Sequence, residues 1–304
     1  MGEPPHGESE TSGRILRGLG VALGLSVAVL AIEVAGAYLS RSLSVTVDAV
    51  HSVPDVFAFA ISYLSLVAAG HGPTEEHTFG SHRLEVFAAI LNAFVILAAG
   101  VIFVYPALLE FLRQTSLLGP VDPAWILFAA VPTLLLRAFA AAYLGRIPRA
   151  ARDLNVRSVL VHLATDVAIT VALLVDALLL LLWPGHLGID AAVALVISAI
   201  LIYESIPIFR GGWDILNERT PRGISMPALI GALETTPHVR EVHDVHVWSV
   251  CPTLVCMTAH VDVDEMPMSD SATVRAELRR RVERQFGIVH AVFELETERK
   301  GPQA

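Results

Sequence analysis

Charged residues are scarce in this sequence. Asp, Glu, Lys and Arg make up 17% of the 304 residues and hydrophobic residues 54%, whereas an ordinary soluble domain is about 25% charged. The mean hydropathy is +0.60. The shortage of charge ends near residue 210, beyond which the composition is that of a soluble domain. This distribution excludes a wholly soluble protein and predicts a membrane part followed by a soluble part.

Cysteine and clustered basic residues are also scarce. Cys251 and Cys256 are the two cysteines, too few for a disulfide framework, and we interpret them as reduced packing residues. The formal net charge of −9, without a clustered basic face, argues against nucleic acid as a partner. The first residues lack the basic start of a signal peptide. Residues 1–13, with three glutamates, are expected to form a disordered polar leader.

Long apolar runs fill the first two thirds of the chain. A helix needs about 20 apolar residues to cross a bilayer. Six segments meet this length, at about 15–39, 43–69, 86–112, 122–144, 156–183 and 187–209. They predict a domain of six transmembrane helices over residues 14–210, followed by a linker at 211–220.

Arginines near the predicted helix ends set the expected orientation. One side of the membrane collects ten of them: Arg14, Arg17, Arg83, Arg146, Arg149, Arg152, Arg157, Arg210, Arg219 and Arg222. The opposite side has Arg41 and Arg113 alone. Because basic loops stay in the cytoplasm, we expect both termini there, in an inner (plasma) membrane.

Ionisable residues inside the predicted spans point to function, since burying them in a bilayer is costly. The second span holds His51 and Asp55, and the fifth holds His162 and Asp166. Residues four apart lie on one face of a helix. Two such faces brought together offer two His nitrogens and two Asp oxygens, a set suited to tetrahedral zinc or a similar divalent cation.

Other readings of these residues stay open. An H-x3-D pair also serves as a hydrogen-bonding contact between helices. Asp48, one turn before His51, can hold the imidazole in one tautomer or can face water at the helix start. Arg137 in the fourth span needs a carboxylate or a water-filled cavity, and Glu33, Asn92 and Asp176 are further polar residues within spans.

In the soluble tail, residues 221–299, hydrophobic residues no longer form long runs but recur at the spacings of short helices and strands. Its pattern predicts the order helix, strand, strand, helix, strand, at about 226–235, 242–250, 253–263, 271–286 and 289–297. That order fits a small α+β domain with its helices on one face of a sheet. Residues two apart share a face of a strand, so Glu294 and Glu296 can act together.

Four stretches resemble the cation diffusion facilitator family. Residues 42–55 resemble its second helix, 77–92 its second loop and the entry of its third helix, and 155–166 its fifth helix. The run Val-His-Asp-Val-His-Val-Trp at 242–248 resembles the opening strand of its cytoplasmic domain. The resemblance extends over nearly the whole chain, from about residue 14 to residue 296.

The resemblance implies a homodimeric zinc exporter that exchanges metal for protons, with His51, Asp55, His162 and Asp166 as its transport site. It implies a ferredoxin-like cytoplasmic domain that binds regulatory metal, with four candidate ligands: His243, His260, Glu294 and Glu296. The loop between the second and third spans offers His77 and His82 as further candidates. Thr74 and Ser81 stand there where two of the loop ligands of some bacterial members would be.

These residues predict a divalent cation transporter, most specifically for zinc, that works by alternating access with H⁺ as the counter-ion. Two other classes are weighed against it. A membrane-anchored metal sensor needs no ligands within the bilayer, and the chain has four. A membrane-embedded metallohydrolase needs an open coordination position and a general base, often in H-E-x-x-H, a motif that the sequence lacks. We therefore expect no enzyme.

Overall fold

The computed structural model describes residues 6–68, 75, 78–80, 82–145, 154–186 and 188–297, and within it the side chains of several helix segments, chiefly 6–19, 61–68 and 154–162, lie outside the description. The chain forms two compact units. The first comprises residues 1–72 with 91–209, and the second comprises 73–90 with 210–304. Each unit is described by itself below.

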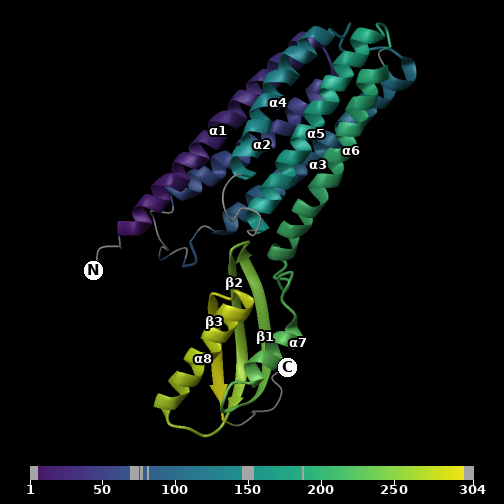
Figure 1. The fold of residues 1–304 in the computed structure, drawn as a ribbon. Helices are drawn as coiled ribbons and strands as arrows, with labels where there is room; N and C mark the ends of the chain where they lie inside the picture. Colours follow the sequence, from purple (N-terminus) through teal and green to yellow (C-terminus); the bar gives the residue numbers. More distant parts are fainter. Residues whose placement is uncertain are drawn as a thin grey trace. The chain divides into compact units, whose positions relative to one another are not determined.

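Six long helices build the membrane part (Figure 1). They are α1 (His6–Ser40), α2 (Leu43–Ala68), α3 (His82–Arg113), α4 (Pro123–Gly145), α5 (Leu154–Leu182) and α6 (Gly188–Leu216). In the described part, all but α2 are long and apolar enough to span a membrane. The 26-residue α2 also has the length of a span, but it carries Asp48, His51 and Asp55. The prediction of an α-helical membrane domain is confirmed.

Two predicted boundaries differ from the structure. The helix α1 begins at His6, so most of the residues expected to form a disordered leader are helical. Residues 6–13 contain no proline, and hydropathy does not detect a polar extension at the start of a helix. The helix α6 continues to Leu216, well into the predicted linker. Gly211 and Gly212 weaken a helix without ending it, and residues 211–216 contain no proline.

Four helices form the centre of the first unit. The helices α1, α2, α4 and α5 pack against one another, and their buried aliphatic side chains share a core with residues of α6 such as Ile197. Gly36 lets α1 approach α4, since a Cβ there would collide with Ala129. The helices α3 and α6 meet where Gly100 faces Ser198 and Ile202. Small residues at such contacts are typical of membrane helices.

The C-terminal domain has the predicted element order (Figure 1): α7 (Met226–Glu234), β1 (Val239–Cys251), β2 (Leu254–Val263), α8 (Met268–Phe286) and β3 (His290–Glu296). The strands β1 and β2 are antiparallel, while β2 and β3 are parallel and are connected through α8. Gly287 ends α8 with a φ of 67°, a left-handed conformation that costs glycine little. The predicted α+β domain is confirmed.

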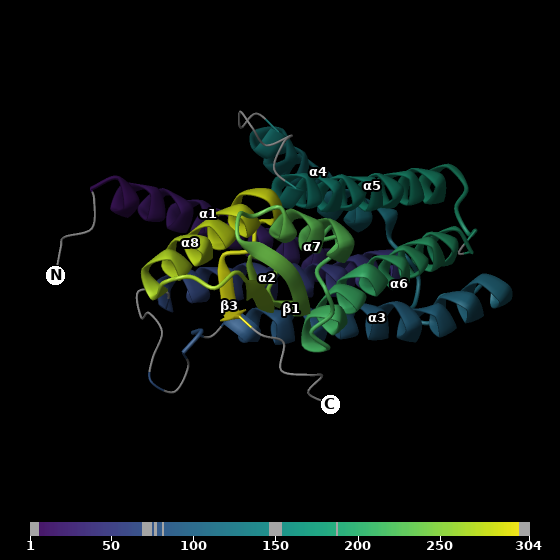
Figure 2. The same cartoon turned by 90° about the horizontal axis from the view of Figure 1, so that it is seen from below.

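Both helices of this domain cover the same face of the sheet (Figure 2). Leu229 and Leu233 of α7 and Leu278 of α8 are fully buried against alternate residues of β2, among them Met257 and Val261. Cys251 and Cys256 are buried free thiols, and burial raises the pKa of Cys256. Because side chains alternate along a strand, the residues between those of the core project from the uncovered face.

Candidate metal centre

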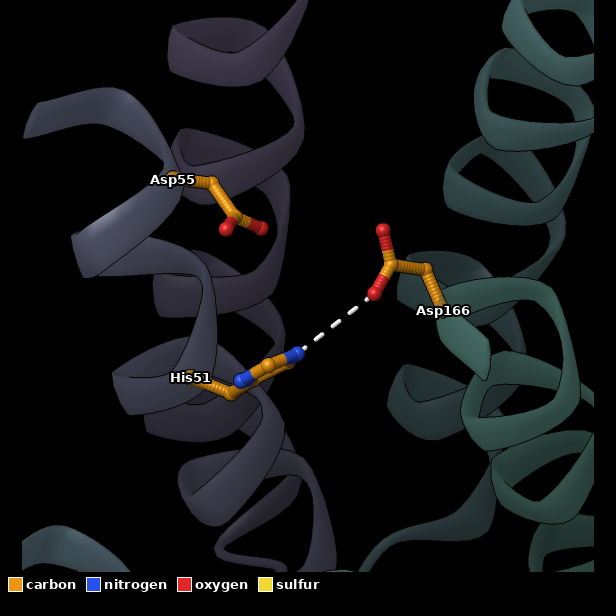
Figure 3. Close-up of side chains that lie close together, drawn as sticks. All are labelled: His51, Asp55 and Asp166. Atoms are coloured by element: carbon orange, nitrogen blue, oxygen red, sulfur yellow. Dashed lines mark hydrogen bonds and ion pairs between the residues drawn. The ribbon is translucent and has the colours of Figure 1, made fainter. Parts of the chain in front are cut away.

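A buried group of metal-ligating side chains lies between α2 and α5. His51 and Asp55 project from one face of α2 toward Asp166 on α5 (Figure 3). One ligand atom from each of the three residues lies within 4.8 Å of the others. His51 is 1% exposed and Asp166 is 4% exposed, while Asp55 is half-buried. The structure therefore brings together three of the four predicted transport residues.

The spacing of these donors suits a small divalent cation. His51 Nε2 and Asp166 Oδ1 are 3.4 Å apart. Zinc is bound by His nitrogen and carboxylate oxygen at about 2.0–2.2 Å, so neighbouring donors in a tetrahedron are roughly 3.3–3.6 Å apart. A cation here would also neutralise two carboxylates that are costly to bury. The arrangement can thus hold a metal ion with little movement of this pair.

The fourth predicted ligand, His162, belongs to α5 one turn before Asp166, and its side chain lies outside the described residues. Residues four apart on a helix share a face. The backbone of α5 is helical at both positions, as the H-x3-D pattern requires. Participation of His162 stays a prediction.

Arg137 of α4 ties the surrounding helices together and is buried. Its partners are polar groups of α1, α2 and α5: Glu33 Oε1 at 2.9 Å, Asp48 Oδ1 at 3.4 Å, Ser52 Oγ at 3.0 Å, Thr170 Oγ1 at 2.6 Å and the main-chain carbonyl of Asp166 at 3.2 Å. All of these partner residues are buried. The guanidinium therefore restrains the helix turns that carry His51 and Asp166.

Asp48 is fully buried, which excludes the alternative that it faces water. Its carboxylate contacts Arg137 and also the carboxyl group of Glu33. Its predicted role in holding the tautomer of His51 stays a prediction. Arg137 was recognised in the sequence as a residue in need of a carboxylate, but hydropathy cannot say which of several acidic residues would meet it.

A second group of ligating residues occupies the uncovered face of the C-terminal sheet. His243 of β1 is paired with His260 of β2, and their ring centroids are 5.5 Å apart. On the other side of β2, His260 pairs with Glu294 and Asp262 pairs with Glu296, both on β3. The strand register thus brings the four predicted cytoplasmic ligands to one surface.

These side chains form two clusters that share Glu296. The first is His243, Asp262 and Glu296, and the second is His260, Glu294 and Glu296. His260 Nδ1 lies 2.7 Å from Glu296 Oε1, whereas His243 Nε2 lies 3.6 Å from Asp262 Oδ1. Sequence reasoning missed Asp262. The signal was present, since Asp262 follows His260 by two residues and alternate strand residues share a face.

A β-bulge in β1 explains how this strand serves the polar face. The register shifts between His243 and His246, and Asp244 adopts a φ of 47°. His246 pairs with Thr258, whose side chain is on the same face as His260. The extra residue allows two histidines three positions apart to share a face, which a regular strand forbids.

Glu296 and the neighbouring acids act on the imidazole of His260. The hydrogen bond with Glu296 and the negative charges of Glu296, Glu294 and Asp244 raise the pKa of His260. A protonated His260 therefore competes with a metal ion for the same position, because metal-bound histidine must be deprotonated.

Of the two predicted loop ligands, the structure describes His82. His77 lies outside the described residues. His82 is exposed at the first position of α3. It belongs to none of the metal-ligating groups found among the described residues. Metal binding in this loop stays a prediction.

A bundle of long apolar helices with candidate metal ligands facing each other inside it, together with an α+β domain, defines a polytopic membrane protein with a candidate metal site in its bundle. Comparison with known families agrees. The family model described as cation efflux transmembrane domain matches residues 19–216, and that of the cation efflux protein cytoplasmic domain matches residues 221–298. The chain belongs to the cation diffusion facilitator (cation efflux) family, a family of transporters.

Three curated relatives are between 24% and 28% identical to this chain. The zinc transporter ZitB of Escherichia coli is 28% identical over 297 residues, which cover 96% of this chain and 92% of the relative. The cadmium, cobalt and zinc/H(+)-K(+) antiporter of Bacillus subtilis is 24% identical over 88% of this chain and 84% of its own length. The human proton-coupled zinc antiporter SLC30A8 is 25% identical over 87% and 72%.

Proposed function

We propose that this protein exports divalent cations, zinc foremost, in exchange for protons by alternating access. The observation that carries the proposal is the buried approach of His51, Asp55 and Asp166 across α2 and α5. Metal ligands inside a helix bundle are expected of a protein that moves an ion across the membrane. Helices that only anchor a soluble domain need no such ligands. The relatives that transport zinc, cadmium or cobalt support the same function, and those with proton coupling in their names support the exchange.

The ligand chemistry accounts for the exchange. Zinc binds histidine and carboxylate in their deprotonated forms, so protons and metal compete for one site. A site open to the neutral cytosol favours loading of the metal. A site open to a more acidic compartment favours protonation of its histidines, whose ordinary pKa is about 6.5, and so favours release. Arg137 keeps the ligand-bearing turns of α2 and α5 in place during each half of the cycle.

Zinc flux into proteoliposomes with an imposed pH gradient tests this function. The wild type should transport zinc when the gradient is present, and both Asp55→Ala and His162→Ala should abolish the flux. His186→Ala, which alters an exposed histidine of the α5–α6 turn, is the matched control and should transport normally. Zinc flux without counter-movement of protons would reject the exchange. Full transport by Asp55→Ala would remove Asp55 from the site.

Flux also separates the transporter from the two other classes. A membrane-anchored sensor would bind zinc without moving it. A metallohydrolase would need an open coordination position, and the proposed quartet fills a tetrahedron. Binding of zinc by the wild type with no flux under any gradient would favour the sensor.

We further propose that the two clusters on the C-terminal sheet bind regulatory zinc, that the protein acts as a homodimer through its cytoplasmic domain, and that it resides in an inner membrane with both termini in the cytoplasm. The short distances among His260, Glu294 and Glu296 support the first point. The match to the family's cytoplasmic domain supports the second.

Asp262 gives a specific test of the regulatory sites. In an Asp55→Ala background, which removes the transport site, Asp262→Asn should reduce the number or affinity of bound zinc ions measured by titration calorimetry. Asp264→Asn is the control, because Asp264 pairs instead with Arg240 and His238. Equal zinc binding by the two variants would exclude Asp262 as a ligand.

A further inference from the structure

A second buried acidic group lies far from the proposed metal ligands, at the end of the bundle where α5 ends and α6 begins. Its members are Ser42 and Ser44 at the start of α2, Asp176 of α5 and Asp190 of α6. All four are at most 1% exposed. Ser44 precedes His51 by seven residues, about 10 Å along α2 at about 1.5 Å per residue. The group is therefore separate from the transport site.

The carboxylate of Asp190 accepts several hydrogen bonds. Its Oδ2 accepts a hydrogen bond from the main-chain N–H of Leu43 at 2.8 Å, and its Oδ1 accepts from Ser42 Oγ at 2.5 Å. Ser44 also offers its hydroxyl to Oδ1, at 2.7 Å. These donors surround the N-terminus of α2, where the helix dipole favours negative charge. Each of them stabilises the ionised carboxylate of Asp190.

Asp176 lacks such support. Its Oδ2 lies 2.8 Å from Ser44 Oγ, the same hydroxyl that faces Asp190. Its Oδ1 is enclosed and has no hydrogen-bond partner among the described residues. A serine hydroxyl has one hydrogen to donate, so it cannot serve both carboxylates at once. When Ser44 donates to Asp190, an ionised Asp176 would be buried with no hydrogen-bond donor among the described residues.

Among the described residues, no basic side chain offsets the negative charge of Asp176 and Asp190. Asp190 is the charged group that acts on Asp176 within the described part of the chain. From α3 a further buried carboxylate, Glu110, faces Asp190. The nearest basic side chains in the sequence, Arg41 and His186, are exposed. Two carboxylates sharing a buried site without a cation cannot both ionise.

We propose that Asp176 is a proton-binding site. One proton on Asp176 Oδ2 is donated to Ser44 Oγ, and Ser44 in turn donates to the ionised Asp190. This relay gives every hydrogen of the group an acceptor and leaves Asp176 neutral. It allows α2, α5 and α6 to meet at this end of the bundle, and loss of the proton would repel Asp176 from Asp190 and loosen the start of α2.

Infrared difference spectroscopy of the full-length protein tests the proton directly. At neutral pH the wild type should show a protonated-carboxyl C=O band that is absent from Asp176→Asn. Glu110→Gln, which removes another buried carboxyl of the same region, is the matched control and should keep the band. The measurement needs neither zinc nor flux, so its outcome is independent of the transport function.

Two results would overturn the proposal. The first is a spectrum of Asp176→Asn identical to that of the wild type, which would mean that Asp176 is ionised. The second is a band that appears only after potassium, sodium and zinc ions have been removed, which would make the group a metal-cation site. Size-exclusion profiles establish that each variant is folded.

Hydrogen–deuterium exchange at the start of α2 tests the structural consequence. Between neutral and alkaline pH, the amides of residues 43–46 should lose protection in the wild type relative to Asp176→Asn, because the amide cannot ionise. Comparing the two proteins at each pH removes the intrinsic pH dependence of exchange. An equal response in both proteins would contradict the proposed loosening.

Discussion

At the scale of single residues, Arg137 is the largest departure from a purely apolar bundle. A guanidinium in a bilayer is costly unless it is paired, and Arg137 has Glu33 and Asp48 as partners. Both partners are buried, and beyond these ion pairs neither oxygen of Glu33 nor Oδ2 of Asp48 has a hydrogen-bond partner among the described residues. Arg137 therefore carries the compensation for two acids at once.

Replacing Arg137 should be strongly destabilising. Removing one member of a buried ion pair costs about 3–5 kcal/mol because a charge is left uncompensated. We expect Arg137→Gln to lower the apparent melting temperature in detergent markedly, and Glu33→Gln in the same chain to restore part of the loss. Arg83→Gln breaks an exposed pair with Glu218 and is the control, with an expected cost within about 1 kcal/mol. Equal melting of the two single variants would contradict the role of Arg137.

At the scale of elements, the sheet of the C-terminal domain has one apolar face and one polar face. One face packs against α7 and α8, and the other carries two histidines and three carboxylates of the metal-ligating clusters. The excess of acid over base on this face makes it sensitive to pH. The titratable histidine concerned is His260, whose Nδ1 lies 2.7 Å from Glu296 Oε1 of β3.

The pH dependence of this contact has a definite sign. Because the folded pKa of His260 is raised, its pairing with Glu296 stabilises the domain fully below the unfolded pKa of about 6.5. The contribution is lost as the pH rises through the raised folded pKa. Since the pair is partly exposed, it amounts to roughly 0.2–1 kcal/mol.

Amide exchange in β3, measured with chelator present, checks this sign. The wild type should be better protected than Glu296→Gln at mildly acidic pH, and the two should converge at alkaline pH. Asp264→Asn alters a carboxylate outside the clusters and should behave as the wild type in β3. A difference that grows with rising pH would show that the sign is wrong.

At the scale of the whole molecule, two separate cores correspond to the two matched family domains. The aliphatic core of the helices and the core of the α+β domain contain no residue in common. We therefore expect a chain ending at Leu216 to remain in the membrane as a helical domain. It should lose dimerisation in light-scattering measurements, while Asp264→Asn in the full-length chain should remain dimeric. A truncated chain of dimer mass would place the principal interface within the helices.

The sequence was sufficient to predict the features that depend on local residue spacing. Apolar runs located the helices α1 to α6 to within a few residues at most ends, and alternation predicted β2 and β3. The H-x3-D spacing selected side chains that the structure brings together at His51, Asp55 and Asp166. These features depend on neighbours within one or two turns of the chain.

Long-range polar pairing was beyond the same reasoning. Asp190 caps a helix that begins 147 residues earlier in the chain, at Leu43. The packing of α1, α2 and α4 brings Glu33 and Asp48 to Arg137. Hydropathy assigns each of these residues a separate free-energy cost of burial in the bilayer. The packing of the helices decides which charged residues meet and so offset that cost.

The bulge in β1 has a consequence for how such sites arise. Val245 keeps its place against the core, while Asp244 occupies the added position and brings its carboxylate to 3.6 Å from His260. Inserting a single codon in a strand can thus give a polar surface a new carboxylate and leave the hydrophobic interior unchanged. Among relatives of this protein, gain or loss of one residue at this point would alter the charge around the histidines without any substitution. Alignments that forbid gaps within strands would overlook that change.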